Sequence, residues 1–295
     1  MKNDFKKISF TAILVAYFRA KYTEMPFAKE IYKKTNGLPI FFKIITPPLT
    51  LLANFFHGTF ERLSSLEGRY LAINQAIEKL KDNFAIIEVA SGLSPRSLEW
   101  VNKKFLYIET DLPEILETKE LIFASILKDK NIENNQNHIF SPLNVLDYEK
   151  WEEIGKKYFS DKNLKVAIIH EGLISYLSRN EQEIFRNNVA RFLRAYSPNG
   201  AWITSDFSLP QKINESWIVK LAKKLIERDT KRKFNHFGDY QLITDFLKQG
   251  GLEAEVLDNS SVVETLTCVP KLKLDKSRVK EMSKTYKVYF IRLKK

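Results

Sequence analysis

Five acidic residues in this chain of 295 residues each follow an apolar segment at the point where a strand is expected to end. They are Glu88, Asp111, Asp147, Glu171 and Asp206. In a parallel sheet these carboxylates converge on the carboxyl edge, where open α/β sheets bind their ligands. Carboxylates accept hydrogen bonds from a ribose diol or an adenine amino group, attract a sulfonium cation and repel phosphates. The pattern therefore favours a nucleoside cofactor without phosphates.

A tight turn supplies the second chemical signal. The segment FAIIEVASGLSPRSLEWVNKKFLYIETDLP (84–113) predicts a strand, a turn around Gly92, a helix, and a strand that leads to Asp111. An acidic residue about 20 positions after such a turn holds the ribose in βαβ cofactor sites. The turn carries Ala90, Gly92 and Ser94, so it offers a pyrophosphate few bare N–H groups. S-adenosylmethionine fits it better than NAD; the alternative is a turn that only builds the sheet.

The elements that position these groups alternate between strand and helix. Strands are expected at 85–89, 105–109, near 141–147, at 165–172 and at 201–207. Helices are expected from Pro95, from Pro113, and over 178–196, where Ser178 and Glu181 form a capping box. This alternation predicts an α/β fold with a parallel, doubly wound sheet. The tail predicts a helix at 240–251 and strands at 252–257 and 286–293, whereas 9–22 and 69–80 have helical periodicity.

Length and composition limit the class of protein. With 295 residues and 44% hydrophobic content, the chain can bury one large α/β core and an appended subdomain. We divide it into an N-terminal helical cap, 1–83, and a cofactor-binding domain, 84–295. Cys268 is the single cysteine, which excludes an intrachain disulfide and a cysteine metal cluster and favours the cytoplasm. The apolar stretch 8–18 looks like a short signal-peptide core, but Arg19 and Lys21 stand where a cleavage site should lie, so we predict a helix there. The stretch 38–56 is interrupted by Lys43, Pro47 and Pro48, which makes it a poor transmembrane span.

The charge is unevenly distributed along the chain. Residues 1–84 carry 13 Lys and Arg against 7 Asp and Glu, residues 85–206 carry 15 against 18, and residues 207–295 carry 19 against 11. Basic regions therefore flank a mildly acidic cofactor region. This arrangement favours an anionic acceptor over the cleft, with nucleic acid along the rim as an alternative. A solvated lysine-rich surface also explains it.

Several ordered pieces of the sequence resemble the leucine carboxyl methyltransferase-like family of S-adenosylmethionine-dependent methyltransferases, which includes O-methyltransferases of the polyketide-biosynthesis type. The pieces are Arg19-Ala20, Arg69, EVASGLSPR (88–96), ETDLPEI (109–115), LNVLD (143–147), EGLISYL (171–177) and GAWITSDF (200–207). They span most of residues 10–207. The resemblance implies a Rossmann-like class I methyltransferase sheet with an N-terminal helical subdomain and a C-terminal lid.

The same resemblance implies a role for each matched residue. Arg69 would pair with the methionine carboxylate of the cofactor, and Glu171 would lie near its methionine portion. Asp111 would bind the ribose hydroxyls, and Tyr176 would face the acceptor. The remaining cofactor positions are Glu88 and Gly92 at the turn, and Asn144, Val145 and Asp147 around the adenine.

Three departures and two structural alternatives accompany these assignments. Ala90 stands where the family has glycine, and Ser94 and Pro95 stand where aspartate and threonine are common. Arg69 could instead be a surface helix residue and Tyr176 a core aromatic residue.

Methyl transfer requires mainly that the acceptor be held in line with the methyl group. An ionised carboxylate acceptor needs no general base, whereas a hydroxyl does, with His170 or His236 as the candidates. His170 could equally be satisfied by neighbouring carboxylates. We therefore expect O-methylation of a small molecule or peptide, with an anionic acceptor and a basic rim from Lys231, Arg232 and Lys233.

Three other functions stay open from the sequence. The first is a methyltransferase-like protein that binds its cofactor without turnover, which the glycine-poor turn suggests. The second is a tRNA-modifying methyltransferase, against which stands the absence of aromatic residues interleaved with the basic cluster. An NAD-dependent dehydrogenase is the weakest reading because its cofactor needs a pyrophosphate cradle.

Overall fold

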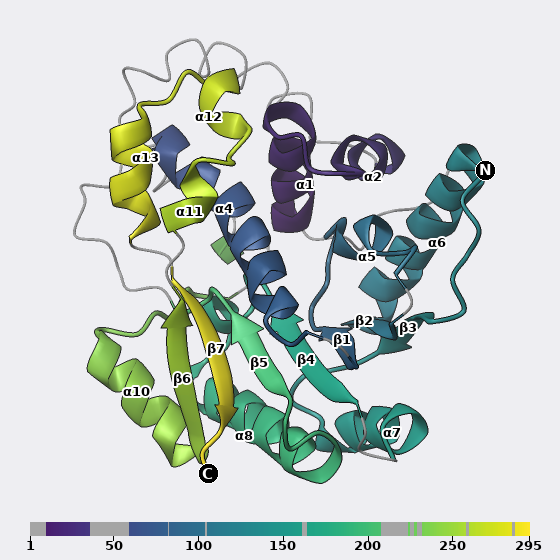
Figure 1. Cartoon of the computed structure of the whole chain (residues 1–295), viewed down its shortest axis with the longest axis vertical. Helices are drawn as coiled ribbons and strands as arrows, with labels where there is room; N and C mark the ends of the chain where they lie inside the picture. The colour runs from purple at the N-terminus through teal and green to yellow at the C-terminus, as the bar shows by residue number, and fades with distance from the viewer. Residues whose placement is uncertain are drawn as a thin grey trace.

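The computed structural model describes most of the chain (Figure 1). The described residues are 10–35, 59–81, 83–103, 105–160, 164–207, 224, 227–228, 232–257, 260–284 and 287–295. The apolar stretch 38–56 and Lys231, which the sequence analysis singled out, lie outside them. Within the described helices, none is both long enough and apolar enough to cross a membrane.

A seven-stranded mixed sheet forms the centre of the fold, in the order β3-β2-β1-β4-β5-β7-β6. Its strands are β1 Phe84–Glu88, β2 Tyr107–Asp111, β3 His138–Pro142, β4 Lys165–His170, β5 Ala201–Thr204, β6 Leu252–Leu257 and β7 Val288–Leu293. The first five strands are parallel, and β7 pairs antiparallel with both β5 and β6. The predicted α/β, doubly wound, Rossmann-like fold is confirmed, and the antiparallel pairing of β7 is a feature that the strand–helix alternation did not predict.

Helices cover both faces of this sheet (Figure 1). On one face lie α7 Tyr148–Tyr158, α8 Arg179–Tyr196 and α10 Tyr240–Gln249. On the other lie α4 Thr59–Glu78, α5 Arg96–Glu99 and α6 Pro113–Lys130, with α1 Phe10–Tyr22 and α2 Ala28–Lys34 beyond them. The short tail helices α11 Ser260–Val263, α12 Cys268–Lys271 and α13 Lys276–Ser283 pack against α4.

Each face of the sheet has its own apolar core. Trp151, Phe185 and Trp202 are fully buried on the α7–α8 face. On the opposite face, Ile73 and Ile77 of α4 join the buried side chains of β1, β4, β5 and β7 in one cluster. Helix α4 therefore shares its core with the sheet, although it lies within the region assigned to the N-terminal cap. The domain boundary at residue 83 stays a prediction.

Local signals set where two of the helices begin. The Ser178 side chain accepts from the backbone N–H of Glu181, and the Glu181 carboxylate accepts from the N–H of Ser178, which confirms the predicted capping box of α8. Pro113 occupies the first turn of α6, where a missing N–H costs nothing. Because α6 begins at Pro113 and α8 at Arg179, the loops that follow β2 and β4 lie at the carboxyl edge of the sheet.

Candidate active site

The turn after β1 has the backbone conformation that close approach of a ligand requires. Ala90 and Gly92 have φ angles of 50° and 47°. The turn is held by two backbone hydrogen bonds, from Val89 N–H to the Ile169 carbonyl at 2.8 Å and from Ser91 N–H to the Thr110 carbonyl at 3.0 Å. Glycine adopts positive φ without steric cost, whereas alanine does not. Ala90 is therefore strained in this turn.

Asp111 at the end of β2 joins the two halves of the βαβ unit. Its Oδ2 accepts from the N–H of Gly92 at 2.8 Å, and its Oδ1 accepts from the N–H of Leu112 at 2.7 Å. Burial raises the pKa of Asp111 above its ordinary value, and these two N–H donors offset only part of that shift. Each carboxylate oxygen can accept more than one hydrogen bond. Asp111 thus both shapes the turn and keeps acceptor capacity for a diol.

Both carboxylate oxygens of Glu88, at the end of β1, accept hydrogen bonds from other side chains of the protein. Its Oε1 accepts from Arg96 Nη1 at 2.7 Å, and its Oε2 accepts from the Tyr107 hydroxyl at 2.7 Å. All three side chains are buried. The floor of the turn is therefore a closed hydrogen-bonded group in which Glu88 has a donor on each oxygen.

Glu171, directly after β4, lies between arginines. Arg96 Nη2 donates to its Oε1, and Arg19 Nη2 donates to its Oε2 at 3.2 Å. Burial raises the pKa of Glu171, but the positive charges of Arg96, Arg19 and Arg69 lower it by a larger amount. The net pKa is therefore below its ordinary value. Glu171 is consequently ionised at neutral pH.

Two of these arginines have unused donors. The Nε atoms of Arg19 and Arg69 are buried, and neither has a hydrogen-bond partner among the described residues. Buried donors are normally satisfied, and the described part of the chain supplies no acceptor for these two. Because both lie around Glu171, the region offers free guanidinium N–H groups to an anion.

The predicted adenine residues lie on the loop between β3 and α7. The N–H of Leu143 donates to the Asp111 carbonyl at 2.9 Å, so this loop begins beside Asp111. Asn144 is exposed, whereas Val145 is buried. Asp147 caps α7 by accepting from the N–H of Glu149 at 3.1 Å. Asn144 and Val145 thus follow directly on the contact with Asp111, and their roles toward a cofactor stay predictions. Asp147 has the structural role expected of a strand-end acid.

His170, the predicted general base, is enclosed in the core. Its Nδ1 lies 3.0 Å from Asp206 Oδ2, and its Nε2 accepts from Trp202 Nε1 at 2.8 Å. The side chain has no exposed surface. Because the indole is a donor only, Nε2 must be the unprotonated nitrogen and Nδ1–H must donate to Asp206. This geometry favours the alternative, a histidine satisfied by a neighbouring carboxylate.

Asp206 also organises the loop that follows Glu171. Besides binding His170, it accepts from the N–H groups of Gly172, Leu173 and Ile174 at 2.7, 2.6 and 3.1 Å. Burial raises the pKa of Asp206, but His170 and the backbone donors bring the net pKa well below its ordinary value. Asp206, one of the five strand-end acids, therefore has a structural role: its carboxylate holds His170 and the loop after β4.

Tyr176 lies in an aromatic row at the surface. It belongs to the short 3₁₀ helix η2, Ile174–Tyr176, and its ring centroid lies 4.9 Å from that of Phe234. Phe234 stacks in turn on His236, at 6.1 Å and 7° between ring planes. Tyr176 is half-buried and His236 is exposed. The tail loop that carries Phe234 and His236 therefore lies beside Tyr176, and the role of Tyr176 toward an acceptor stays a prediction.

Two arginines were not assigned a site role from the sequence. In the sequence, Arg96 is the last residue of the matched segment EVASGLSPR, and Arg19 belongs to the matched pair Arg19-Ala20. Arg96 is fully buried between Glu88 and Glu171. The signal that could have found it is a basic residue eight positions after Glu88, in a region otherwise rich in acids.

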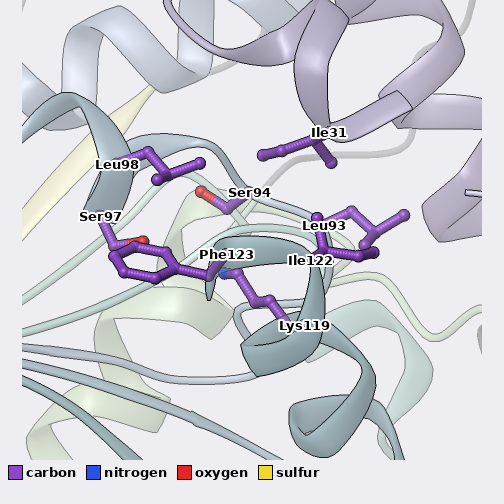
Figure 2. A pocket seen from close by; sticks show the side chains of 8 residues that line it. All are labelled: Ile31, Leu93, Ser94, Ser97, Leu98, Lys119, Ile122 and Phe123. Carbon is purple, nitrogen blue, oxygen red and sulfur yellow. The ribbon is translucent and has the colours of Figure 1, made fainter. Parts of the chain in front are cut away.

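A small pocket lies behind the turn, between α2, α5 and α6 (Figure 2). It is lined mostly by apolar side chains, with Ser94, Ser97 and Lys119 as the polar contributors. None of the residues predicted to bind the cofactor lines it. Leu93 and Ser94, which directly follow Gly92, form part of its wall.

Comparison with known families agrees with this geometry. Residues 68–190 match the model of the leucine carboxyl methyltransferase family, which confirms the resemblance drawn from the sequence. The matched segment contains every predicted cofactor residue, from Arg69 to Glu171, and also Tyr176. No curated protein matches the chain.

Solved structures with a similar fold have low sequence identity to this chain. An O-methyltransferase family protein from Burkholderia thailandensis is 10% identical, with a TM-score of 0.47, and the match covers 90% of this chain and 71% of that one. The pyocyanin biosynthetic protein PhzM is 12% identical, with a TM-score of 0.43 and coverages of 77% and 55%. Geranyl diphosphate C-methyltransferase from Streptomyces coelicolor A3(2) is 12% identical, with a TM-score of 0.46 and coverages of 80% and 84%.

Proposed function

We propose that this protein, whose residues 68–190 match the leucine carboxyl methyltransferase family, is an S-adenosylmethionine-dependent methyltransferase. One observation carries the proposal: at the carboxyl edge of the sheet, the carboxylate of Asp111 is hydrogen-bonded to the N–H of Gly92 in the turn after β1. This contact supports the proposal because an acid at this position of a βαβ unit is suited to bind a ribose beside a turn that a ligand can approach closely.

The residues at this edge fit the cofactor. The Nε atoms of Arg19 and Arg69, which have no hydrogen-bond partner within the described ranges, are suitable donors for a ligand carboxylate. Asp111 would hold the ribose hydroxyls, and Asn144 and Val145 would lie along the adenine. When bound, the cofactor supplies an electrophilic methyl group on a sulfonium. The protein's task is to bind both partners, align them and exclude water.

The acceptor we propose is an oxygen nucleophile on a small molecule or peptide, with an ionised carboxylate favoured over a hydroxyl. A carboxylate already carries the lone pair and charge needed for attack, whereas a hydroxyl must lose a proton. His170 is buried with both ring nitrogens engaged, so it is poorly placed to take that proton. His236, on the exposed loop beside Tyr176, is the remaining candidate if the acceptor is a hydroxyl.

Calorimetric titration with S-adenosylmethionine and S-adenosylhomocysteine tests the cofactor. We expect micromolar binding to the wild type and loss of about tenfold or more for Asp111→Ala, because a hydrogen bond to a charged group is worth about 1.5–3 kcal/mol. Asp275→Ala is the matched control, since Asp275 also accepts from two backbone N–H groups but lies at the start of α13. A folded wild type that binds neither compound would contradict the proposal.

The acceptor class has its own test. A protein that binds cofactor is incubated with S-adenosylmethionine carrying a labelled methyl group and with candidate carboxylic acids, phenols and tRNA. Carboxyl methyl esters release labelled methanol in mild base, whereas methyl ethers and methylated bases do not. Base-labile label supports the carboxylate acceptor. Stable label on a phenol or on tRNA would replace it, and binding without transfer to any acceptor would favour a non-catalytic protein.

A further inference from the structure

Arg96 stands at the junction of the elements that build the cofactor site. It is the first residue of α5, directly after the turn, and none of its surface is exposed. Its guanidinium donates to Glu88 on β1 at 2.7 Å, to Asn74 on α4 at 2.7 Å, and to Glu171 after β4. A fourth hydrogen bond goes to the Tyr70 carbonyl at 3.4 Å. One side chain therefore spans the turn, the loop after β4 and the helix that carries Arg69.

The geometry of this junction depends on a planar fork. Nη1, Nη2 and Nε point in different directions within one plane, and each reaches a different element. The same plane lies over the Tyr70 ring, with the guanidinium carbon 4.3 Å from the ring centroid. Lysine would offer one compact ammonium on a flexible stem, so it could not satisfy these partners simultaneously.

Arg96 also balances the buried carboxylates. Glu88 and Glu171 both lie within hydrogen-bond distance of it, and leaving a buried charge unpaired is strongly unfavourable. Of the positive charges around Glu171, that of Arg96 does most to offset the effect of burial and so to lower the pKa of its carboxyl. Without Arg96, we expect Glu171 to take up a proton at a higher pH than in the wild type.

We infer that Arg96 is a positioning residue that holds the turn and the carboxylate of Glu171 in the geometry required to bind S-adenosylmethionine. The inference rests on the proposed function. Because Arg96 is fully buried, it acts through Glu88 and Glu171 and does not contact the ligand itself. Arg96 and Glu171 are faced by six other charged or titratable side chains, which are Arg19, Arg69, Tyr70, Glu88, Glu99 and Tyr107.

Three variants test the inference by calorimetric titration with S-adenosylmethionine. Arg96→Lys keeps the charge and loses the fork, and we expect the Kd to rise about tenfold, with a pH profile parallel to that of the wild type. Arg96→Gln loses the charge as well. Its Kd should rise further and should increase as the pH is lowered, because without the charge of Arg96 the carboxyl of Glu171 takes up a proton at a higher pH than in the wild type. Asn74→Ala is a milder change: it removes the acceptor of Arg96 Nε and a 3.5 Å hydrogen bond to Glu99, and it should raise the Kd a few-fold.

Arg186→Lys is the matched control. Arg186 is also a buried arginine that lies over an aromatic ring and donates to several partners, among them the Phe246 carbonyl at 2.7 Å, but it joins α8 to α10. It should lower thermal stability without changing the Kd. If Arg96→Gln does not fold, Arg96→Lys and Asn74→Ala still decide the matter.

Each outcome has a distinct meaning. Wild-type affinity in folded Arg96→Lys and Asn74→Ala would overturn the inference and leave the methyltransferase proposal standing. Equal weakening by Arg186→Lys, or an unchanged pH profile in folded Arg96→Gln, would reduce Arg96 to a general stabilising role and overturn it too. A folded wild type that binds neither S-adenosylmethionine nor S-adenosylhomocysteine would remove both the proposed function and the inference.

Discussion

The acidic residues at the strand ends are similar in sequence position but differ in use. Glu88 and Glu171 are occupied by arginines, and Asp206 holds the loop after β4. Asp111 alone among these four has only backbone N–H partners. Because of this difference, we propose that Asp111 contacts the ribose directly. We assign Glu88 the indirect role of supporting the turn through Arg96 and Tyr107.

A single strained residue in the turn leads to a stability prediction. Ala90 has φ 50°, a conformation that costs a residue with a Cβ about 1–2 kcal/mol. We therefore expect Ala90→Gly to raise the free energy of unfolding by about 1 kcal/mol, measured by urea denaturation. Ala72→Gly, inside α4, is the control and should lower it by a similar amount. Destabilisation by Ala90→Gly would show that the methyl group contributes more packing energy than the turn loses in strain.

At the scale of elements, a buried ion cluster attaches α6 to the sheet. Lys119 of α6 pairs with Glu109 of β2, whose Oε1 lies 3.0 Å from His138 Nε2 on β3. The ring of His138 stacks on Phe123 of α6, with centroids 4.2 Å apart. Lys119 also donates to the Ser91 carbonyl at 3.4 Å, which links the cluster to the cofactor turn.

This cluster predicts an acid-dependent loss of stability. Burial raises the pKa of Glu109, but Lys119 and His138 lower it more, to about 2. A carboxyl whose folded-state pKa is depressed stabilises the fold above its unfolded pKa of about 4.3, and that contribution is lost as the pH falls toward 2. Glu109→Gln should therefore destabilise the protein at pH 7 by about 3 kcal/mol, because it leaves Lys119 unpaired. In this variant the free energy of unfolding should also fall less steeply as the pH is lowered into the acid range.

Denaturant unfolding at several pH values measures this effect. Glu153→Gln, which breaks an exposed pair with Lys150, is the control and should change the free energy of unfolding by less than about 1 kcal/mol at every pH. Parallel acid limbs for the wild type and Glu109→Gln would contradict the assignment.

At the scale of the whole molecule, the tail and the N-terminal helices are tied together through α4. Glu67 of α4 is buried and accepts from the backbone N–H groups of Thr267 and Cys268, at 3.0 and 2.9 Å, and from the Thr267 hydroxyl. Thr267 Oγ1 in turn accepts from the N–H of Glu24, between α1 and α2. Segments 200 and 201 residues apart thus meet at the carboxylate of Glu67.

Glu67→Gln tests this connection. An amide has one acceptor oxygen where the carboxylate has two, so at least one buried donor loses its partner, at a cost of about 1–3 kcal/mol. We expect a lower urea midpoint and faster amide hydrogen exchange in residues 265–272. Glu264→Gln, at an exposed pair with Lys276, should change neither quantity. Unchanged exchange in Glu67→Gln would argue that apolar packing alone holds α12 in place.

The sequence by itself determined the features that depend on local order. The alternation of strands and helices, the capping box of Ser178 and Glu181, and the position of Asp111 at the end of the strand that follows the Gly92 turn are set by neighbouring residues or by one βαβ unit. These interactions span few positions, so periodicity and spacing reveal them.

Only the tertiary structure decided which long-range partner each charged side chain takes. The antiparallel entry of β7, the burial of His170 between Asp206 and Trp202, and the contacts of Glu171 with Arg96 and Arg19 join residues 32 to 152 positions apart. Spacing along the chain carries no information about such pairs, because the packing of helices on the sheet determines which side chains meet and which are shut away from solvent.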